Sequence, residues 1–436
     1  MQVHRQAVHA GYGRVIVPTA REIAARLIAF DTTVDRPGDP PAAEAACQRY
    51  IGDLLTAAGF EVDTWEPAVD DLRAHPMYRP PQNWHDRPIT VGRLAGSGGG
   101  RSLILNGHID TVPAGDVSEW TSDPWKPEVR DGRLYGRGAC DMKGGLACAL
   151  HAALTHATSA RRLAGDLIVE AVTDEEINGL GTVACLMRGY RADAAIVPEP
   201  TMLDMWRAFR GILVGRLHVD GRAGHVEVAQ PHWMQGGGVN AISKATRILD
   251  VLRNLSDDWR TRPDKRHPLC SPGAIQPTMI HGGDFASTIP AGCEVSLNIC
   301  YVPGEEDEAG MGGNVKREVE GYLERAARAD PWLAEHPPRI SWEVELPPAE
   351  IPETVSLVRE LQETARERGA AGRARGLDTW DDTASLILAG IPAVSFGPGS
   401  DDQAHAVDEY VDLGQLERCS AVLTAFIERW CGAPQG

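Results

Sequence analysis

The chain has 436 residues, of which 43% are hydrophobic and 24% charged, and it is long enough for two or three globular domains. Its formal net charge of −18 argues against a nucleic acid or an anionic membrane as a partner, because such surfaces attract cationic proteins. Nine scattered cysteines without a CxxC pair, an N-terminus without an apolar signal core and the lack of a bilayer-length apolar run predict a soluble, cytoplasmic protein.

The first half of the chain alternates helical and strand patterns. Helices are expected over residues 19–30, 42–58 and 146–157, and strands over 60–65, 89–94, 102–106, 166–172 and 194–197. This alternation predicts an α/β domain, with a mostly parallel sheet and helices on both faces. Strands 89–94 and 102–106 are expected to pair as a hairpin through the glycine run 96–100. A phosphate cradle is rejected there, because a strand and not a helix follows the glycines.

The pattern changes after Trp206. Strands over 211–220, 294–301 and 342–346 and helices over 239–255 and 314–329 predict a compact α+β unit inserted into the first domain. A strand over 391–396 is expected to rejoin the first sheet. The predicted division is a first domain over 1–206, an inserted domain over 207–348 and a second part of the first domain over 349–436.

Imidazole and carboxylate side chains gather where the predicted strands end. His108 and Asp110 follow an apolar strand and share a face, because residues i and i+2 of a strand point the same way. Asp141 lies on a glycine-bounded turn before an apolar helix. Further along come Asp174-Glu175-Glu176, Glu199 and His405. Carboxyl ends of parallel strands collect functional residues, and this set of ligands suits two divalent cations.

The order of these motifs resembles the family of dinuclear metal amidohydrolases and exopeptidases that includes acetylornithine deacetylase, succinyl-diaminopimelate desuccinylase, aminoacylase and glutamate carboxypeptidase. The resemblance runs from about Ile23 to Leu413. It implies a zinc exopeptidase-like catalytic domain with an inserted α+β lid that carries a dimer contact. It also implies two Zn²⁺ ions as cofactors, for which Co²⁺ or Mn²⁺ can substitute.

The resemblance assigns a role to each candidate ligand. It places His108, Asp141 and Glu199 on the first metal and Asp141, Glu176 and His405 on the second, so that Asp141 bridges the two. A carboxylate has two oxygens and can bind two cations at once. Asp110 is implied to fix the ring of His108 and to raise its basicity.

Two further catalytic roles follow from the resemblance. Glu175 is implied as the general base; only the family's order of residues separates its role from that of Glu176. His225 is implied to steady the oxyanion, often from the partner subunit, which predicts a homodimer. The spacer after His225 lacks the family's usual serine and is longer than usual.

The chain also departs from the family where a substrate carboxylate is held. Many members have Asp-Ala-Arg at the place of Asp382-Thr383-Ala384, with the Arg as the clamp. Residues 286–290 likewise lack an Asn that many members carry. Arg210 is the candidate to substitute for the clamp. The missing Arg leaves open a substrate without a free α-carboxylate, such as a heterocyclic formamide.

Three functions are therefore weighed. The leading one is a metal-dependent hydrolase that cleaves the amide bond of a small-molecule N-acyl substrate. This substrate is either an N-acylated amino acid or an N-acylated small amine. The second is a dipeptidase or glutamate-type carboxypeptidase, which would share every metal ligand. The third is a catalytically silent metal-binding scaffold, against which Glu175 argues, because a scaffold needs no base.

Overall fold

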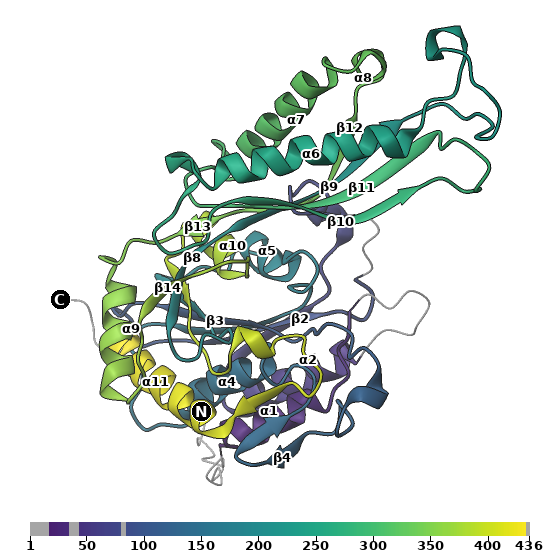
Figure 1. Cartoon of the computed structure of the whole chain (residues 1–436). Helices are drawn as coiled ribbons and strands as arrows, with labels where there is room; N and C mark the ends of the chain where they lie inside the picture. Colours follow the sequence, from purple (N-terminus) through teal and green to yellow (C-terminus); the bar gives the residue numbers. More distant parts are fainter. Residues whose placement is uncertain (1–16, 35–42, 80–83, 433–436) are drawn as a thin grey trace, which may run out of the picture.

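Two large sheets organise the computed structural model, which describes residues 17–34, 43–79 and 84–432. Figure 1 shows a nine-stranded mixed sheet, covered by helices, and a four-stranded antiparallel sheet above it. A third sheet consists of three short strands in the order β16 (Tyr410–Asp412), β5 (Arg133–Tyr135) and β4 (Glu128–Arg130).

The centre of the nine-stranded sheet is parallel. Its four central strands lie in the order β6 (Leu167–Val172), β3 (Leu103–His108), β7 (Ala194–Val197) and β15 (Ala393–Ser395). These strands are apolar along most of their length, as expected of strands buried on both faces. The outer strands are β1 (Glu61–Trp65), β2 (Ile89–Leu94), β8 (Met205–Phe209), β13 (Ala349–Glu350) and β14 (Ala374–Leu377). The predicted α/β fold is confirmed.

The predicted hairpin between β2 and β3 is wrong. Strand β6 lies between them, antiparallel to β2 and parallel to β3. The glycine run therefore crosses beside β6 and contacts the segment that leads into it, where Ser97 N–H donates to Leu163 O at 2.9 Å. A Cβ on Gly96 would lie 2.4 Å from Ala164 O, so the close approach requires glycine.

Helices cover both faces of the nine-stranded sheet (Figure 1). One face carries α1 (Ala20–Ile28), α2 (Glu44–Ala57), α4 (Lys143–Ala157), α9 (Ser356–Glu367) and α11 (Leu413–Cys431). The other carries α3 (Val69–Leu72), α5 (Leu180–Met187) and α10 (Thr383–Leu388). Thr19 begins α1 with a capping box. The start expected for the second helix, at residue 42, lies outside the described residues. The short helix α3 was not predicted.

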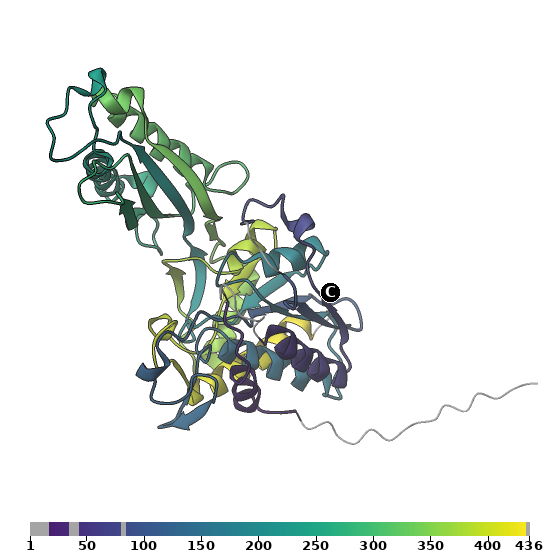
Figure 2. The ribbon, with the colours of Figure 1, turned by 90° about the vertical axis from the view of Figure 1, so that its right-hand side faces the viewer.

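The four-stranded sheet has the order β10-β11-β9-β12, with two long helices on one face. Its strands are β9 (Gly211–Asp220), β10 (Ala274–Gly282), β11 (Gly292–Tyr301) and β12 (Arg339–Leu346). Its helices are α6 (Ala241–Trp259), α7 (Gly313–Ala327) and the short α8 (Pro331–Glu335). These elements enclose a hydrophobic core of their own and stand obliquely out from the rest of the molecule (Figure 2). We call this unit the lid.

The chain passes from one sheet to the other at Arg210, between β8 and β9, and returns at β13. The predicted boundary at residues 206 and 207 falls inside β8, and the division into domains stays a prediction. Short 3-10 helices cover Val117–Glu119, Trp233–Gln235, Pro263–Lys265 and Asp401–Gln403. No helix within the described ranges is long and apolar enough to span a membrane.

Candidate active site

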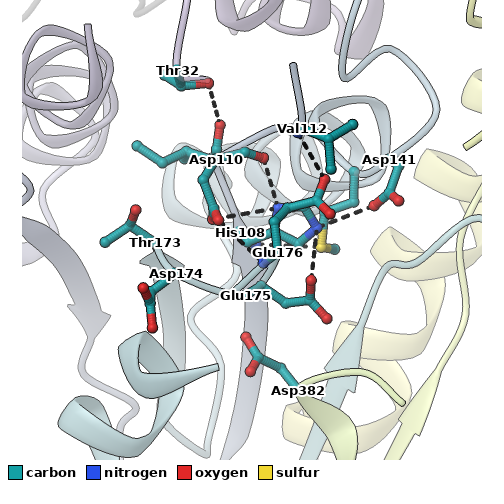
Figure 3. Close-up of polar contacts among 12 residues, drawn as sticks. Thr32, His108, Asp110, Val112, Asp141, Thr173, Asp174, Glu175, Glu176 and Asp382 are labelled. Atoms are coloured by element: carbon teal, nitrogen blue, oxygen red, sulfur yellow. Dashed lines mark hydrogen bonds and ion pairs between the residues drawn. The ribbon is translucent and has the colours of Figure 1, made fainter. Parts of the chain in front are cut away.

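Three neighbouring strands bring the predicted ligands to one edge of the sheet. His108 ends β3, Glu176 follows β6, and Glu199 follows β7. These strands are adjacent and parallel, so their carboxyl ends meet. Asp141 joins them from the turn before α4, and His405 from the loop after β15. Figure 3 shows several of these side chains turned toward one another around His108.

The five predicted ligands form two groups that share Asp141. Potential ligand atoms of His108, Asp141 and Glu199 all lie within 4.8 Å of one another, and so do those of Asp141, Glu176 and His405. Asp141 Oδ1 lies 3.1 Å from His108 Nε2, whereas Oδ2 lies 3.4 Å from His405 Nε2. The two oxygens of one carboxylate thus face different histidines, which is the arrangement that a bridging ligand requires.

The chemistry of this cluster fits two divalent cations. Glu199 Oε1 is buried and has no hydrogen-bond partner among the described residues. Burial raises the pKa of Glu199 well above its usual range, and the neighbouring Asp141 raises it further. Hydrogen bonds to Asp141 and Glu176 raise the pKa of His405 to about 10. In the metal-free cluster, protons on these side chains therefore offset the charge of the neighbouring carboxylates. Two bound cations would offset the same charge in their place. The nearby Cys140 thiol contacts Ser400 O at 3.2 Å.

The ring of His108 is oriented mainly by a backbone group. Its Nδ1 lies 2.9 Å from the carbonyl oxygen of Asp110 and 3.6 Å from the Asp110 carboxylate. An Nδ1–H that donates to this carbonyl leaves Nε2 free to bind a metal. The Asp110 carboxylate instead accepts the backbone N–H of Glu176 at 3.2 Å. Asp110 thus links the strand that carries His108 to the loop that carries Glu175 and Glu176.

Glu175 lies beside the cluster without belonging to either ligand group. Its Oε2 is 3.9 Å from His108 Nε2, and burial raises its pKa well above the usual range. The preceding Asp174 has a left-handed backbone with φ of 76°. Two contacts hold the Asp174 carboxylate in place. The Arg87 guanidinium lies 3.5 Å from it, and the Leu180 N–H donates to it at 3.4 Å.

A buried ion pair behind Asp141 has no counterpart in the sequence-based predictions. Glu409 accepts the backbone N–H groups of Gly138, Cys140 and Asp141. Its carboxylate pairs with Arg137 at 2.7 Å, and both side chains are almost fully buried. No local pattern could have indicated this pair, because its members lie 272 residues apart.

A cavity of about 450 Å³ adjoins the cluster. It is lined by acidic residues, among them Glu175 and Asp381, and by Trp206 and Trp380. No Lys or Arg is among the described residues that line it. Arg210, the expected clamp, is absent from this lining, and its guanidinium lies 3.9 Å from Asp378.

His225 does not join the cluster within its own chain. It is exposed on the loop between β9 and α6, and it is not among the residues that line the cavity. This loop extends beyond the end of β9, away from the nine-stranded sheet (Figure 1). There the Glu227 N–H donates to His225 Nδ1 at 3.3 Å.

Residues 104–429 match the sequence profile of Peptidase family M20/M25/M40. The chain belongs to this family. An M20 relative from Halalkalibacterium halodurans, N-formyl-4-amino-5-aminomethyl-2-methylpyrimidine deformylase, is 33% identical over 93% of the chain and 92% of its own length. An acetylornithine deacetylase from Myxococcus xanthus is 31% identical over 95% of the chain and 98% of its own length.

A solved structure has the same fold. The dinuclear metal-binding M20 peptidase YXEP from Bacillus subtilis superposes with a TM-score of 0.64 at 14% identity, over 95% of this chain and 98% of that one. The predicted family is confirmed, and this M20 protein is a hydrolase of amide bonds from a metal-dependent family. Membership disfavours the alternative of a silent scaffold.

Proposed function

We propose that this protein removes the formyl group from a small heteroaromatic amine and releases formate and the free amine. The observation that carries this proposal is the lining of the cavity, which combines two tryptophans with carboxylates and, among the described residues, has no Lys or Arg side chain. Relatives from Halalkalibacterium halodurans and Bacillus subtilis that are named as deformylases of an aminomethylpyrimidine support it, at 33% and 30% identity.

The proposed metal centre holds two Zn²⁺ ions, with Co²⁺ or Mn²⁺ as substitutes. The first ion would be held by His108, Asp141 and Glu199, and the second by Asp141, Glu176 and His405. When bound, such cations supply Lewis acidity, which polarises a carbonyl group and lowers the pKa of water. Imidazole and carboxylate ligands without a thiolate suit these borderline and hard ions.

Glu175 would carry the proton through the reaction. As a water oxygen attacks the formyl carbon, the Glu175 carboxylate accepts a proton from that water. The carbon–nitrogen bond then breaks, Glu175 gives the proton to the departing nitrogen, and the water oxygen remains in formate. Burial raises the pKa of the Glu175 carboxyl, which suits the return of the proton to the departing nitrogen.

The cavity does not favour the alternatives that the sequence left open. N-acylated amino acids and peptides with a free C-terminus carry a carboxylate beside the scissile bond, which calls for Arg or Lys. Among the described residues, the lining has no Arg or Lys, and its acidic side chains outside the two ligand groups are those of Glu175, Asp381 and Asp401. These acidic side chains disfavour a substrate carboxylate beside the scissile bond and suit a substrate that lacks one.

We further propose a homodimer that forms through the lid. Strand β10 is one of the two outer strands of the lid sheet, and its residues from Gln276 onward are exposed. Met279, Ile280 and the nearby Phe285 are 55%, 50% and 71% exposed. An exposed edge strand with apolar side chains is suited to pairing with another strand, here from a second copy. In such a dimer His225 would reach the partner's site and donate to the developing oxyanion.

A hydrolysis screen tests the proposed function. N-formyl, N-acetyl and N-succinyl amines and dipeptides are incubated with the protein and Zn²⁺, Co²⁺ or Mn²⁺, and release of the free amine is measured. Formamides of heteroaromatic amines should give the highest kcat/KM. Preferential hydrolysis of dipeptides or N-acetyl amino acids would refute the proposal.

A further inference from the structure

Asp381 is a carboxylate of the cavity that the metal centre does not use. It lies on the loop between β14 and α10, belongs to neither ligand group and lines the cavity together with Trp206 and its neighbour Trp380. Among the described residues, no Lys, Arg or His forms an ion pair with it. A buried carboxylate without a cation calls for other hydrogen-bond donors.

Short hydrogen bonds fix the Asp381 carboxylate in one orientation. Thr383 N–H donates to Oδ1 at 2.8 Å, and the Ser395 hydroxyl donates to Oδ2 at 2.6 Å. Ser395 Oγ also lies 2.8 Å from Thr383 Oγ1, which ties the two donors together. Each carboxylate oxygen can accept two hydrogen bonds, so acceptor capacity remains. An acceptor held in this way loses little conformational entropy when a ligand binds.

The aromatic wall beside Asp381 is fixed as well. The six-membered ring of Trp380 packs on Gly179, where an added Cβ would lie 2.1 Å from Trp380 Cη2. Gly179 has a φ of 68° and is the N-cap residue of α5, three residues after Glu176. The tryptophan is therefore packed against the loop that carries the candidate catalytic residues. Trp206 adds a second indole to the lining from β8.

We infer that Asp381 is a specificity-determining residue, which accepts a hydrogen bond from an exocyclic amino group on a heteroaromatic ring that contacts Trp206 and Trp380. This inference rests on the proposed function and narrows it to amines whose ring carries an N–H donor. A site built around a buried acceptor discriminates strongly against analogues without the donor, because binding them leaves the acceptor unpaired.

Two formamides of similar size test the inference. N-formyl-4-amino-5-aminomethyl-2-methylpyrimidine has the ring amino group, and N-formylbenzylamine lacks it. The wild-type protein should favour the first by at least about tenfold in kcat/KM. Asp381→Asn should lower kcat/KM for the aminopyrimidine by about ten- to hundredfold, because one amide N–H₂ would then meet the amino donor. Its kcat/KM for N-formylbenzylamine should change by less than about threefold.

Asp378→Asn is the matched control. It removes the same charge from a side chain that is 56% exposed and outside the cavity, and it should leave both rates unchanged. If Asp381→Asn does not fold, Ser395→Ala, which releases one bond to the carboxylate, should still lower the preference for the aminopyrimidine while metal content is retained.

Each outcome separates the inference from the proposed function. Equal loss of both rates, an unchanged preference in Asp381→Asn and Ser395→Ala, or a wild-type protein without preference would each overturn the role of Asp381 and leave formamide hydrolysis intact. A wild-type protein that hydrolyses neither formamide but cleaves N-acetyl amino acids would overturn the proposed function itself.

Discussion

The buried carboxylate of Glu409 accepts the backbone N–H of Asp141 at 3.0 Å. The same oxygen accepts the N–H of Cys140 at 2.7 Å, and the other oxygen pairs with Arg137. Arg137 in turn donates to the carbonyl oxygen of His405 at 3.3 Å. One ion pair therefore joins the turn that carries Asp141 to the loop that carries His405, and it sets the positions of two candidate ligands for the same metal.

We expect Glu409→Gln to lower metal affinity by about ten- to hundredfold, the usual effect of losing a group that orients metal ligands. The amide cannot accept from three backbone N–H groups and Arg137 at once, so the turn would loosen. Titration of the metal-free protein with Zn²⁺ measures the dissociation constants. Glu428→Gln is the control, because this glutamate is 51% exposed in a surface ion pair. Wild-type affinity in Glu409→Gln would show that the ion pair does not position the ligands.

Metal removal should abolish activity reversibly. Active protein is expected to hold up to two divalent ions per chain, which the two ligand groups around Asp141 would bind. Asp141→Asn keeps one oxygen but loses the charge and the bridge, so it should bind at least one ion fewer. Metal analysis before and after chelation, with activity assays after Zn²⁺ is returned, checks this prediction. Fully active protein without metal would contradict the whole site assignment.

Glu175→Gln should lower kcat by at least about a hundredfold while metal content stays unchanged. Glutamine keeps the size of the side chain but cannot accept a proton from water. Glu175 lies outside both ligand groups, which is why metal binding should survive. Parallel measurements of turnover and metal content test this, with Glu176→Gln as the comparison that should lose metal. Near-normal turnover in Glu175→Gln would exclude it as the base.

The candidate ligands could be predicted from the sequence because each stands beside a local signal. His108 ends an apolar strand, Asp141 lies on a glycine-bounded turn, and Glu199 follows another apolar strand. The rule that parallel strands place their carboxyl ends together then predicts their convergence. The Asp110 carbonyl was not foreseen as the acceptor for His108, because backbone groups leave no mark in a sequence.

Features that depend on distant pairing could not be predicted. Strands β2, β3 and β6 have similar apolar patterns, so nothing local says that β6 separates the other two. Arg137 and Glu409 are charged residues of the kind usually found at the surface, and each is buried only because the other is. Asp381 likewise becomes part of a cavity only through the loop that follows β14.

Stability should depend on pH through Glu170, a fully buried carboxyl in β6 that accepts a hydrogen bond from Asn106 at 2.9 Å. Burial raises the pKa of Glu170 from 4.5 to about 7. Between these values the folded protein keeps a proton that the unfolded chain releases, so the free energy of unfolding falls as pH rises through this window. The loss attributable to Glu170 is about 3 kcal/mol.

The variant Glu170→Gln stays neutral and should lack this part of the pH dependence. Denaturant unfolding of the metal-free wild type and variant at pH 5 and pH 8 gives the difference between their free energies of unfolding at each pH. The contributions of other titrating groups cancel in this difference. We expect Glu170→Gln to gain stability relative to the wild type at pH 8 but not at pH 5. The same difference at both pH values would mean that Glu170 does not titrate in this range.

If His225 acts across a dimer, two inactive variants should restore activity to each other. Glu175→Gln subunits lack the proposed base, and His225→Ala subunits lack the proposed oxyanion donor. A mixed dimer contains one site in which a wild-type Glu175 meets a wild-type His225 from the partner, so activity should return toward about half of the wild-type value per mixed dimer.

Subunit exchange is verified with differently tagged chains, and either variant mixed with itself is the control. Verified exchange without recovered activity would mean that His225 works within its own chain or has no role. A protein that is monomeric at assay concentration would exclude the mechanism directly, because the exposed His225 is absent from the cavity of its own chain.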